Sequence, residues 1–325
     1  MMKTSSACLC CVLLLFSAHH TLSVEPVMAI SVVVPAGLEE VDGNSKSALP
    51  FSDLVDFNFY LGPIRYQQVY NASAFSKLPA SGAYLTFIAF RGDCLSREPT
   101  TATNLTVFLS TTSARADSLS GTFRENVGPD EVNVFDTRRS PFGSDGALCP
   151  SAFSSSGFSL SIPFLYDLAR GNLLMELQNL GVRRPLFQSL SMFDTQLAND
   201  EVSRVAARSL EATSAQVVDS EGLVTLLGFY AKPELIATYE TNTVVLKWPY
   251  RPDPFVLQFK ESSVSGTVWK DFVGTVSRAI GGYKVATIPE SALKPKQFYR
   301  LYWNSPQPSL PAPAGSATVN PAVGE

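Results

Sequence analysis

Aromatic and amide side chains at alternate positions are the first candidates for ligand binding in this sequence. Tyr66, Gln68 and Tyr70 fall on one face of an expected strand over 66–70, because side chains of a strand point alternately to its two faces. An exposed stripe of this kind would suit a polysaccharide, which takes apolar stacking together with amide hydrogen bonds. Ordinary cross-strand packing is the alternative interpretation.

Two tryptophans could also act as flat platforms for a sugar ring. Trp248 alternates with Val244 and Leu246, which predicts a place in the core of a small β-domain, as for strand tryptophans of sandwich folds. Trp269 is therefore the candidate ligand-binding tryptophan, with packing in the core as its alternative.

Paired carboxylates are the feature that a glycosidase would need. Adjacent residues on a strand point to opposite faces, and residues three apart meet only on a helical turn. The clusters concerned are Asp53 with Asp56, Asp130 with Glu131, and Asp200 with Glu201. A working pair would need carboxylates from different strands, so solvated edge and loop charges are the preferred interpretation.

Calcium is the one cofactor for which the sequence offers ligands. The stretches 128–136 and 143–146 carry carboxylates near expected loops, and Ca²⁺ prefers such oxygen ligands. Neither stretch matches a D-x-D-x-D-G loop. The candidate ligands of a structural Ca²⁺ are Asp130, Glu131, Asp136 and Asp145.

The start of the chain has the pattern of a secretory signal peptide. A short basic segment precedes the apolar run 7–18, which is shorter than the ~20 residues that a membrane-spanning helix needs. We expect residues 1–29 to be removed, with an uncleaved anchor as the alternative. No later stretch is expected to cross a membrane.

Cleavage would remove both histidines, His19 and His20. A Ser-His-Asp or Cys-His device and His-ligated metal sites are then excluded. Cys94 and Cys149 would remain, and in an oxidising compartment two cysteines most simply form one disulfide. Two buried free thiols are the alternative.

Composition excludes further classes. The 325 residues are 45% apolar and 17% charged, which argues against a disordered chain. The formal net charge of −4 argues against nucleic acid as a partner, because phosphates favour a basic surface. The tripeptide Arg91-Gly92-Asp93 matches an integrin motif, and chance is the preferred explanation because tripeptides recur.

A period of two dominates the rest of the chain and predicts an all-β fold. We expect a large, jelly-roll-like β-sandwich over 30–231 and a small immunoglobulin-like or fibronectin-III-like sandwich over 232–304. A Pro/Ala-rich spacer over 305–325 is expected to be disordered. The segment 200–210 fits either a short helix or a strand.

Several stretches resemble a class of exported bacterial β-sandwich proteins. They include RYQQVYNASAF (65–75), LTFIAFRGD (85–93) and GLVTLLGFY (222–230). Many members end in a PEP-CTERM sorting tail, which this chain lacks, and the class has no assigned activity. The segments VVLKWP and FVLQFKES (244–249, 255–262) look like a fibronectin-III-like repeat of similar secreted proteins.

These observations predict a secreted, non-catalytic binding or adhesion protein of the cell surface or extracellular matrix. The expected partner is extracellular polysaccharide or an envelope component, bound through Tyr66, Gln68, Tyr70 and Trp269. A carbohydrate-active hydrolase with paired carboxylates is one alternative. A structural surface-layer component, held by association of edge strands, is the other.

Overall fold

The computed structural model describes residues 30–55, 58–93, 100–142, 153, 157–183, 192–198, 200–249, 255–261, 268–279, 283–293 and 297–303. Four sequence-based predictions fall outside these residues. They are the signal peptide, the Pro/Ala-rich tail, the Cys94–Cys149 disulfide and the Asp145 carboxylate.

The described residues form an all-β protein, so the predicted fold class is confirmed. The first group of strands is β1 (Ile30–Val34), β2 (Ser45–Ser47), β3 (Asp53–Val55), β4 (Asn58–Tyr60), β5 (Ile64–Tyr70), β6 (Ala83–Phe90), β7 (Thr100–Thr112), β8 (Val132–Phe142), β9 (Gly157–Tyr166), β10 (Asn172–Arg183), β11 (Phe193–Leu197), β12 (Val202–Ala207), β13 (Val217–Asp219), β14 (Glu221–Leu223) and β15 (Thr225–Ala231). The second group is β16 (Ile236–Glu240), β17 (Thr243–Pro249), β18 (Phe255–Lys260), β19 (Lys270–Asp271), β20 (Val276–Ala279), β21 (Tyr283–Pro289) and β22 (Phe298–Trp303).

Among the residues that the structure describes, helical structure is confined to short segments. They are α1 (Phe123–Asn126) and the 3-10 turns η1 (Ala72–Phe75), η3 (Leu168–Arg170) and η4 (Glu290–Ala292). Within the described part of the chain, none of the helices has the length and apolar character needed to cross a membrane.

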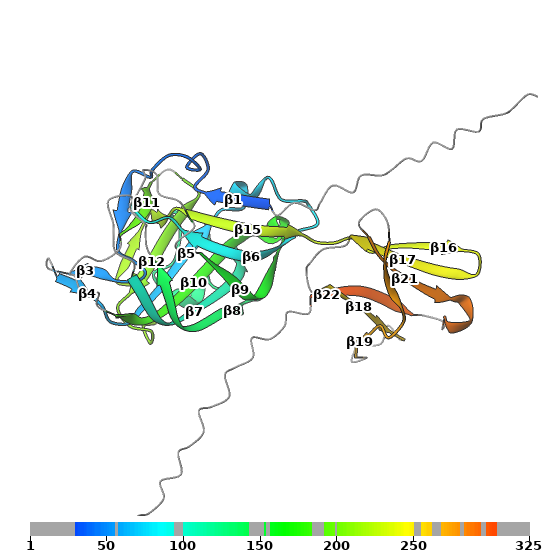
Figure 1. Ribbon diagram of the computed structural model, residues 1–325. Coiled ribbons are helices and arrows are strands. Elements are labelled where there is room, and N and C mark those ends of the chain that lie inside the picture. The colour runs from blue at the N-terminus through cyan, green and yellow to red at the C-terminus, as the bar shows by residue number, and fades with distance from the viewer. Residues whose placement is uncertain are drawn as a thin grey trace, which may run out of the picture.

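The strands divide into two units, which lie side by side in Figure 1. Among the described residues, β1 to β15 pair with one another and form the large unit, and β16 to β22 pair with one another and form the small unit. The division falls between Ala231 and Ile236. The predicted domain boundary at residue 232 lies in this interval.

The core of the large unit lies between two antiparallel sheets. One has the strand order β1-β15-β6-β9 and the other the order β13-β12-β5-β10-β7-β8. Leu85 of β6 and Leu227 of β15 belong to the same buried cluster as Leu109 of β7 and Met175 of β10. Side chains from the two facing sheets therefore close a β-sandwich. The sheet β14-β11-β2 and the hairpin β3-β4 complete the unit.

Strand β5 is covered on both of its faces. Ile64 and Tyr66 belong to the sandwich core, whereas Val69 belongs to a second buried cluster that includes Phe123 of α1. The segment around α1 therefore packs on the outer side of the six-stranded sheet, at β5. A central strand covered in this way offers no face to a ligand.

The segment 200–210, which fits a helix or a strand in the sequence, contains strand β12. It pairs with β5 on one side and β13 on the other, and all six of its residues are buried. Because both faces of β12 are covered, the sequence VSRVAA has no regular alternation of polar and apolar residues to identify a strand.

The small unit is built from two antiparallel sheets. Their strand orders are β16-β17-β21-β20 and β19-β18-β22. Leu246 and Trp248 of β17, Leu257 of β18 and Ile288 of β21 form its core. Trp248 is only 2% exposed, so its predicted place in the core of a small β-domain is confirmed.

Candidate binding site

The outer face of the sheet β19-β18-β22 gathers cations and aromatic rings. Lys260 of β18 lies opposite Phe298 of β22, Gln258 lies opposite Arg300, and Val256 lies opposite Tyr302. Their neighbours Leu257, Tyr299 and Leu301 pack on the other side, against the core, as the alternation of strand side chains requires. The cation–aromatic face, as we call it, consists of Gln258, Lys260, Trp269, Phe298, Arg300 and Tyr302.

Trp269 lies between the two cations of this face. The guanidinium carbon of Arg300 lies 4.3 Å from the centroid of the Trp269 ring, and the Nζ atom of Lys260 lies 4.9 Å from it. Arg300 also lies 5.1 Å from the Tyr302 ring, and Lys260 lies 5.6 Å from the Phe298 ring. At these distances the ring quadrupole attracts each cation, so the side chains support one another in a row.

A hydrogen-bond relay orients the guanidinium of Arg300. Its Nε and Nη2 atoms donate to Oε1 of Gln258, at 3.0 and 2.8 Å. Nε2 of Gln258 donates in turn to Oδ1 of Asp271, at 2.9 Å. Within the described residues, no hydrogen bond uses Nη1 of Arg300, and no carboxylate pairs with Arg300 or with Lys260. The cation–aromatic face therefore presents hydrogen-bond donors that a bound anion can use.

Two rings of the face are open to solvent. Phe298 is 39% exposed and Tyr302 is 47% exposed. Because these rings flank the cations on the same sheet, a ligand that contacts the cations would also meet apolar surface.

The predicted binding stripe on β5 is wrong. Tyr66, Gln68 and Tyr70 are all fully buried, because the face of β5 that they share packs inside the sandwich core. The Tyr66 hydroxyl donates to Oε1 of Gln68 at 2.5 Å, and Nε2 of Gln68 donates to the carbonyl of Leu223 at 3.1 Å. Burial raises the pKa of the Tyr70 hydroxyl, which lies 3.1 Å from Oγ1 of Thr225. These residues form a polar network inside the core, as the packing interpretation expects.

The predicted calcium ligands do not come together in the described part of the chain. Asp130 accepts a hydrogen bond from the backbone N–H of Thr111 at 2.7 Å and pairs with Arg170 at 3.5 Å. Glu131 pairs with Arg124, and Asp136 is exposed on β8. Among the described residues, no group of three acidic, histidine or cysteine side chains could hold a metal ion. The prediction of a calcium site built from Asp130, Glu131 and Asp136 is therefore not supported.

Several carboxylates of the large unit are held in ion pairs. Arg91 donates from Nε to Oδ2 of Asp194 at 2.7 Å and also donates to the carbonyls of Leu38 and Val41. Glu176 binds Arg65, Asp53 binds Arg208, and Asp219 and Glu221 bind Arg204. Arg91 is fully buried, so its side chain anchors the segment 38–41 and is not accessible as an adhesion motif.

One carboxyl group stands apart from these pairs. Asp200 and Glu201 line a hollow of 360 Å³ together with Pro35, Ala36, Leu38 and Gln196. Burial, with a smaller effect from Asp117 and Glu201, raises the pKa of Asp200 to about 6, against the opposing hydrogen bond from the N–H of Val202. Among the described residues, Oδ2 of Asp200 is buried without a hydrogen-bond partner. The described residues that line this hollow include no aromatic ring on which a sugar could stack.

Sequence reasoning identified Trp269 but missed the other members of the cation–aromatic face. The sequences of the two strands already show which residues of each strand share a face. In FVLQFK (255–260) alternate positions include Gln258 and Lys260, and in FYRLYW (298–303) they include Phe298, Arg300 and Tyr302. Only the pairing of β18 with β22 shows that these two sets share a face.

Comparisons with protein-family models, curated proteins and solved structures found no match to this chain. The resemblances to exported bacterial sandwich proteins and to a fibronectin-III-like repeat therefore stay predictions. Evidence for a function comes from the geometry of the site itself.

Proposed function

We propose that this protein is an exported, non-catalytic binding protein that holds acidic polysaccharide on its cation–aromatic face. One observation carries the proposal. Lys260 and Arg300 both lie against the ring of Trp269, and neither is paired with a carboxylate in the described part of the chain.

The aromatic rings supply the apolar part of the recognition. Sugar rings present C–H groups on their flat sides, and these stack on aromatic faces with a large gain in buried apolar area. Phe298 and Tyr302 are open to solvent at the two ends of the row, so successive sugars of a chain would find successive rings.

The cations supply the preference for an acidic polymer. A carboxylate or sulfate of the polysaccharide can accept charge-assisted hydrogen bonds, which are about twice as strong as neutral ones. Nη1 of Arg300 is oriented by the bonds from Nε and Nη2 to Gln258, whereas the Lys260 ammonium acts as a point charge. A neutral polysaccharide would leave both cations without partners.

A carbohydrate-active hydrolase is the second candidate, favoured by the raised pKa of Asp200 beside Glu201. A general acid of a glycosidase needs such a pKa. However, Oε2 of Glu201 accepts a hydrogen bond from the N–H of Ala36, and the aromatic platforms lie on the small unit. We therefore propose binding without a reaction.

The test is a binding titration of the full chain with polygalacturonate, dextran and a single-stranded DNA oligomer. We expect saturable binding of polygalacturonate that weakens as salt is added, because salt screens exposed charges, and no binding of dextran. Tighter binding of the DNA would assign the face to nucleic acid, since bases also stack on aromatic rings beside cations. Binding of none of the three probes would overturn the proposal.

A matched pair of variants localises the site. Trp269→Ala should weaken binding of polygalacturonate by roughly 1–3 kcal/mol, whereas Tyr239→Ala, which removes a 60% exposed ring from β16 on the other sheet, should bind as the wild type does. Release of reducing ends from polygalacturonate, lost in Asp200→Asn, would support the hydrolase instead.

A further inference from the structure

We infer that the cleft between the two units is a second subsite for the same acidic polysaccharide, so that a long chain contacts both units. The inference rests on the proposed function and extends it. It places the ligand across a junction that no sequence motif identifies.

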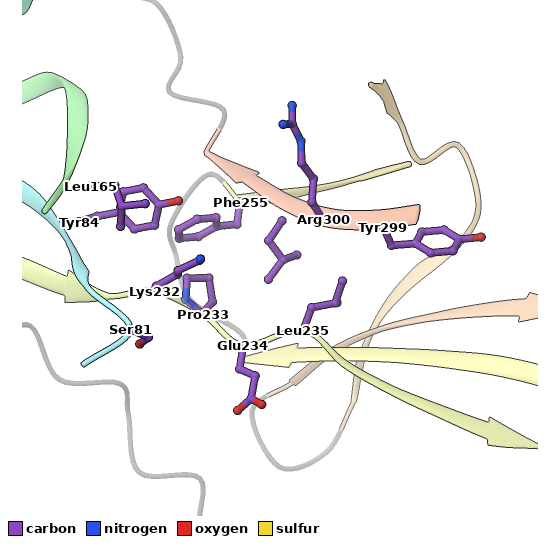
Figure 2. A pocket seen from close by; sticks show the side chains of 11 residues that line it. Ser81, Tyr84, Leu165, Lys232, Pro233, Glu234, Leu235, Phe255, Tyr299 and Arg300 are labelled. Atoms are coloured by element: carbon purple, nitrogen blue, oxygen red, sulfur yellow. The ribbon is translucent and has the colours of Figure 1, made fainter. Parts of the chain in front are cut away.

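The cleft has the size and position of a ligand site. Its volume is 770 Å³, within the range of ~300–1,000 Å³ that is usual for ligand pockets, which often lie between domains. Figure 2 shows Tyr84 and Leu165 entering from the large unit, Lys232 and Pro233 from the connecting segment, and Phe255 from the small unit. A molecule in this space would touch all three parts of the chain.

Aromatic rings from both units meet in the cleft. The rings of Tyr84 and Phe255 are 5.5 Å apart and inclined at 63°, an edge-to-face arrangement. Tyr299 also lines the cleft. The cleft therefore offers the stacking surfaces that the cation–aromatic face offers, in a more enclosed form.

The charges in the cleft favour an anion. Lys232 and Arg300 line it, against the single carboxylate of Glu234. In Figure 2 the Glu234 carboxylate and the Arg300 guanidinium both point away from the other labelled side chains, and the Lys232 ammonium lies among them, beside Phe255. Within the described residues, Lys232 has no ion pair with a carboxylate, so its ammonium can bind an acidic group of the ligand.

Arg300 connects the cleft with the cation–aromatic face. It lines the cleft and also stacks on Trp269 and Tyr302. Its charge acts on Tyr84 of the large unit, where it opposes the upward shift that burial causes in the pKa of the hydroxyl. One side chain thus borders both surfaces, and a polymer that reaches both would pass along Arg300.

A ligand that spans the junction would also fix the orientation of the two units. The units are joined by the segment 232–235 between β15 and β16, and small interfaces between domains usually allow relative motion. A polysaccharide chain bound to Trp269 and to Tyr84 together would restrict that motion.

The test compares a short and a long probe on the full chain. Trigalacturonate and a dodecamer of galacturonate are titrated into the wild type, Lys232→Gln, Tyr84→Ala and the control Lys77→Gln, which removes an exposed lysine from the large unit. We expect the two cleft variants to bind the dodecamer about tenfold more weakly, which corresponds to about 1.4 kcal/mol, and to bind the trimer unchanged. The control should match the wild type with both probes.

The outcomes separate the two proposals. If the cleft variants bind the dodecamer as the wild type does while Trp269→Ala binds both probes more weakly than the wild type, the cleft is no subsite and the proposed function stands. If the wild type binds neither probe, both fail. Lys232→Gln keeps the test valid if Tyr84→Ala proves unstable, because Lys232 lies in the connecting segment and packs in no core cluster of the described residues.

Discussion

The guanidinium of Arg300 lies 4.3 Å from the Trp269 ring, and Gln258 holds it there through two hydrogen bonds. Arg300 belongs to β22 and Trp269 directly precedes β19, so β18 lies between them in the sheet. These two bonds fix one donor edge of the arginine, and within the described residues no hydrogen bond uses its Nη1 atom. The proposed binding of acidic groups depends on this donor.

Replacing Trp269 by alanine should weaken binding of polygalacturonate by roughly 1–3 kcal/mol, the value of one lost aromatic contact together with its cation–π interactions. Isothermal titration measures the change. The free energy of unfolding should change little, because Trp269 is not part of the core cluster of the small unit. An unchanged affinity would show that the ligand does not use this ring.

Removing the charges of Lys260 and Arg300 should separate the electrostatic contribution to binding from that of ring stacking. The double variant Lys260→Gln and Arg300→Gln should lose most of the salt dependence of binding, because exposed charges act through a screened field. Lys247→Gln, whose lysine pairs with Glu240 on the other sheet, is the matched control and should keep the wild-type salt dependence. Equal salt dependence in all three proteins would contradict the role given to the cations.

The hydroxyl of Tyr66, one of the two buried tyrosines of β5, should affect the stability of the fold and not the binding of polysaccharide. Tyr66→Phe removes the hydroxyl that donates to Gln68 and should lower the free energy of unfolding by about 1 kcal/mol. Polygalacturonate should bind this variant as it binds the wild type. A loss of affinity without a loss of stability would show that the binding site includes Tyr66 of β5.

Breaking the Arg91–Asp194 pair should destabilise the large unit strongly. Both side chains are buried, and removing one partner leaves the other as an uncompensated buried charge, at a cost of about 3–5 kcal/mol. Urea unfolding of Arg91→Met measures this. The control Arg124→Met breaks the exposed pair with Glu131 and should cost less than about 1 kcal/mol.

Asp200 should make stability depend on pH in a defined window. Its pKa is raised from 3.8 to about 6, first by burial, so the folded state disfavours the charged carboxylate. The loss of folding free energy that comes from burying this charge is absent below pH 3.8, grows as the pH rises, and is complete above about pH 6. Asp200→Asn keeps the acceptor for the N–H of Val202 and should raise the melting temperature at neutral pH.

The same comparison of melting temperatures at acidic pH is the control for Asp200→Asn. Below pH 3.8 the carboxyl group is protonated in the folded and unfolded states alike, so Asp200→Asn should melt together with the wild type. The gain at neutral pH should be about 1 kcal/mol, because this half-buried side chain is partly screened by solvent. A stabilisation that is the same at both pH values would contradict the assignment.

Local patterns predicted the strands well wherever one face is polar. In β18 (255–260) and β22 (298–303) the outward residues Gln258, Lys260 and Arg300 alternate with the core residues Leu257, Tyr299 and Leu301, so FVLQFK and FYRLYW show the period of a strand. The pattern is weaker for β12, whose residues are all buried, and for the short strands β2 and β14, which have too few residues to show a period.

The site was harder to predict than the strands, because alternation identifies a face and not what covers it. Tyr66 and Tyr70 do share a face, but that face is the sandwich core. Trp269 was identified as a single residue. Its partners Lys260 and Arg300 come from two strands whose pairing is set by tertiary packing, which one sequence does not reveal.

The central claim is that the small unit recognises negative charge along a sugar chain. The most direct measurement compares the affinity of the full chain for polygalacturonate and for the same polymer with its carboxylates methyl-esterified. Both polymers offer the same rings for stacking, and only the first offers anions. We predict at least about tenfold tighter binding of the free acid, and equal affinity for the two polymers would contradict the account.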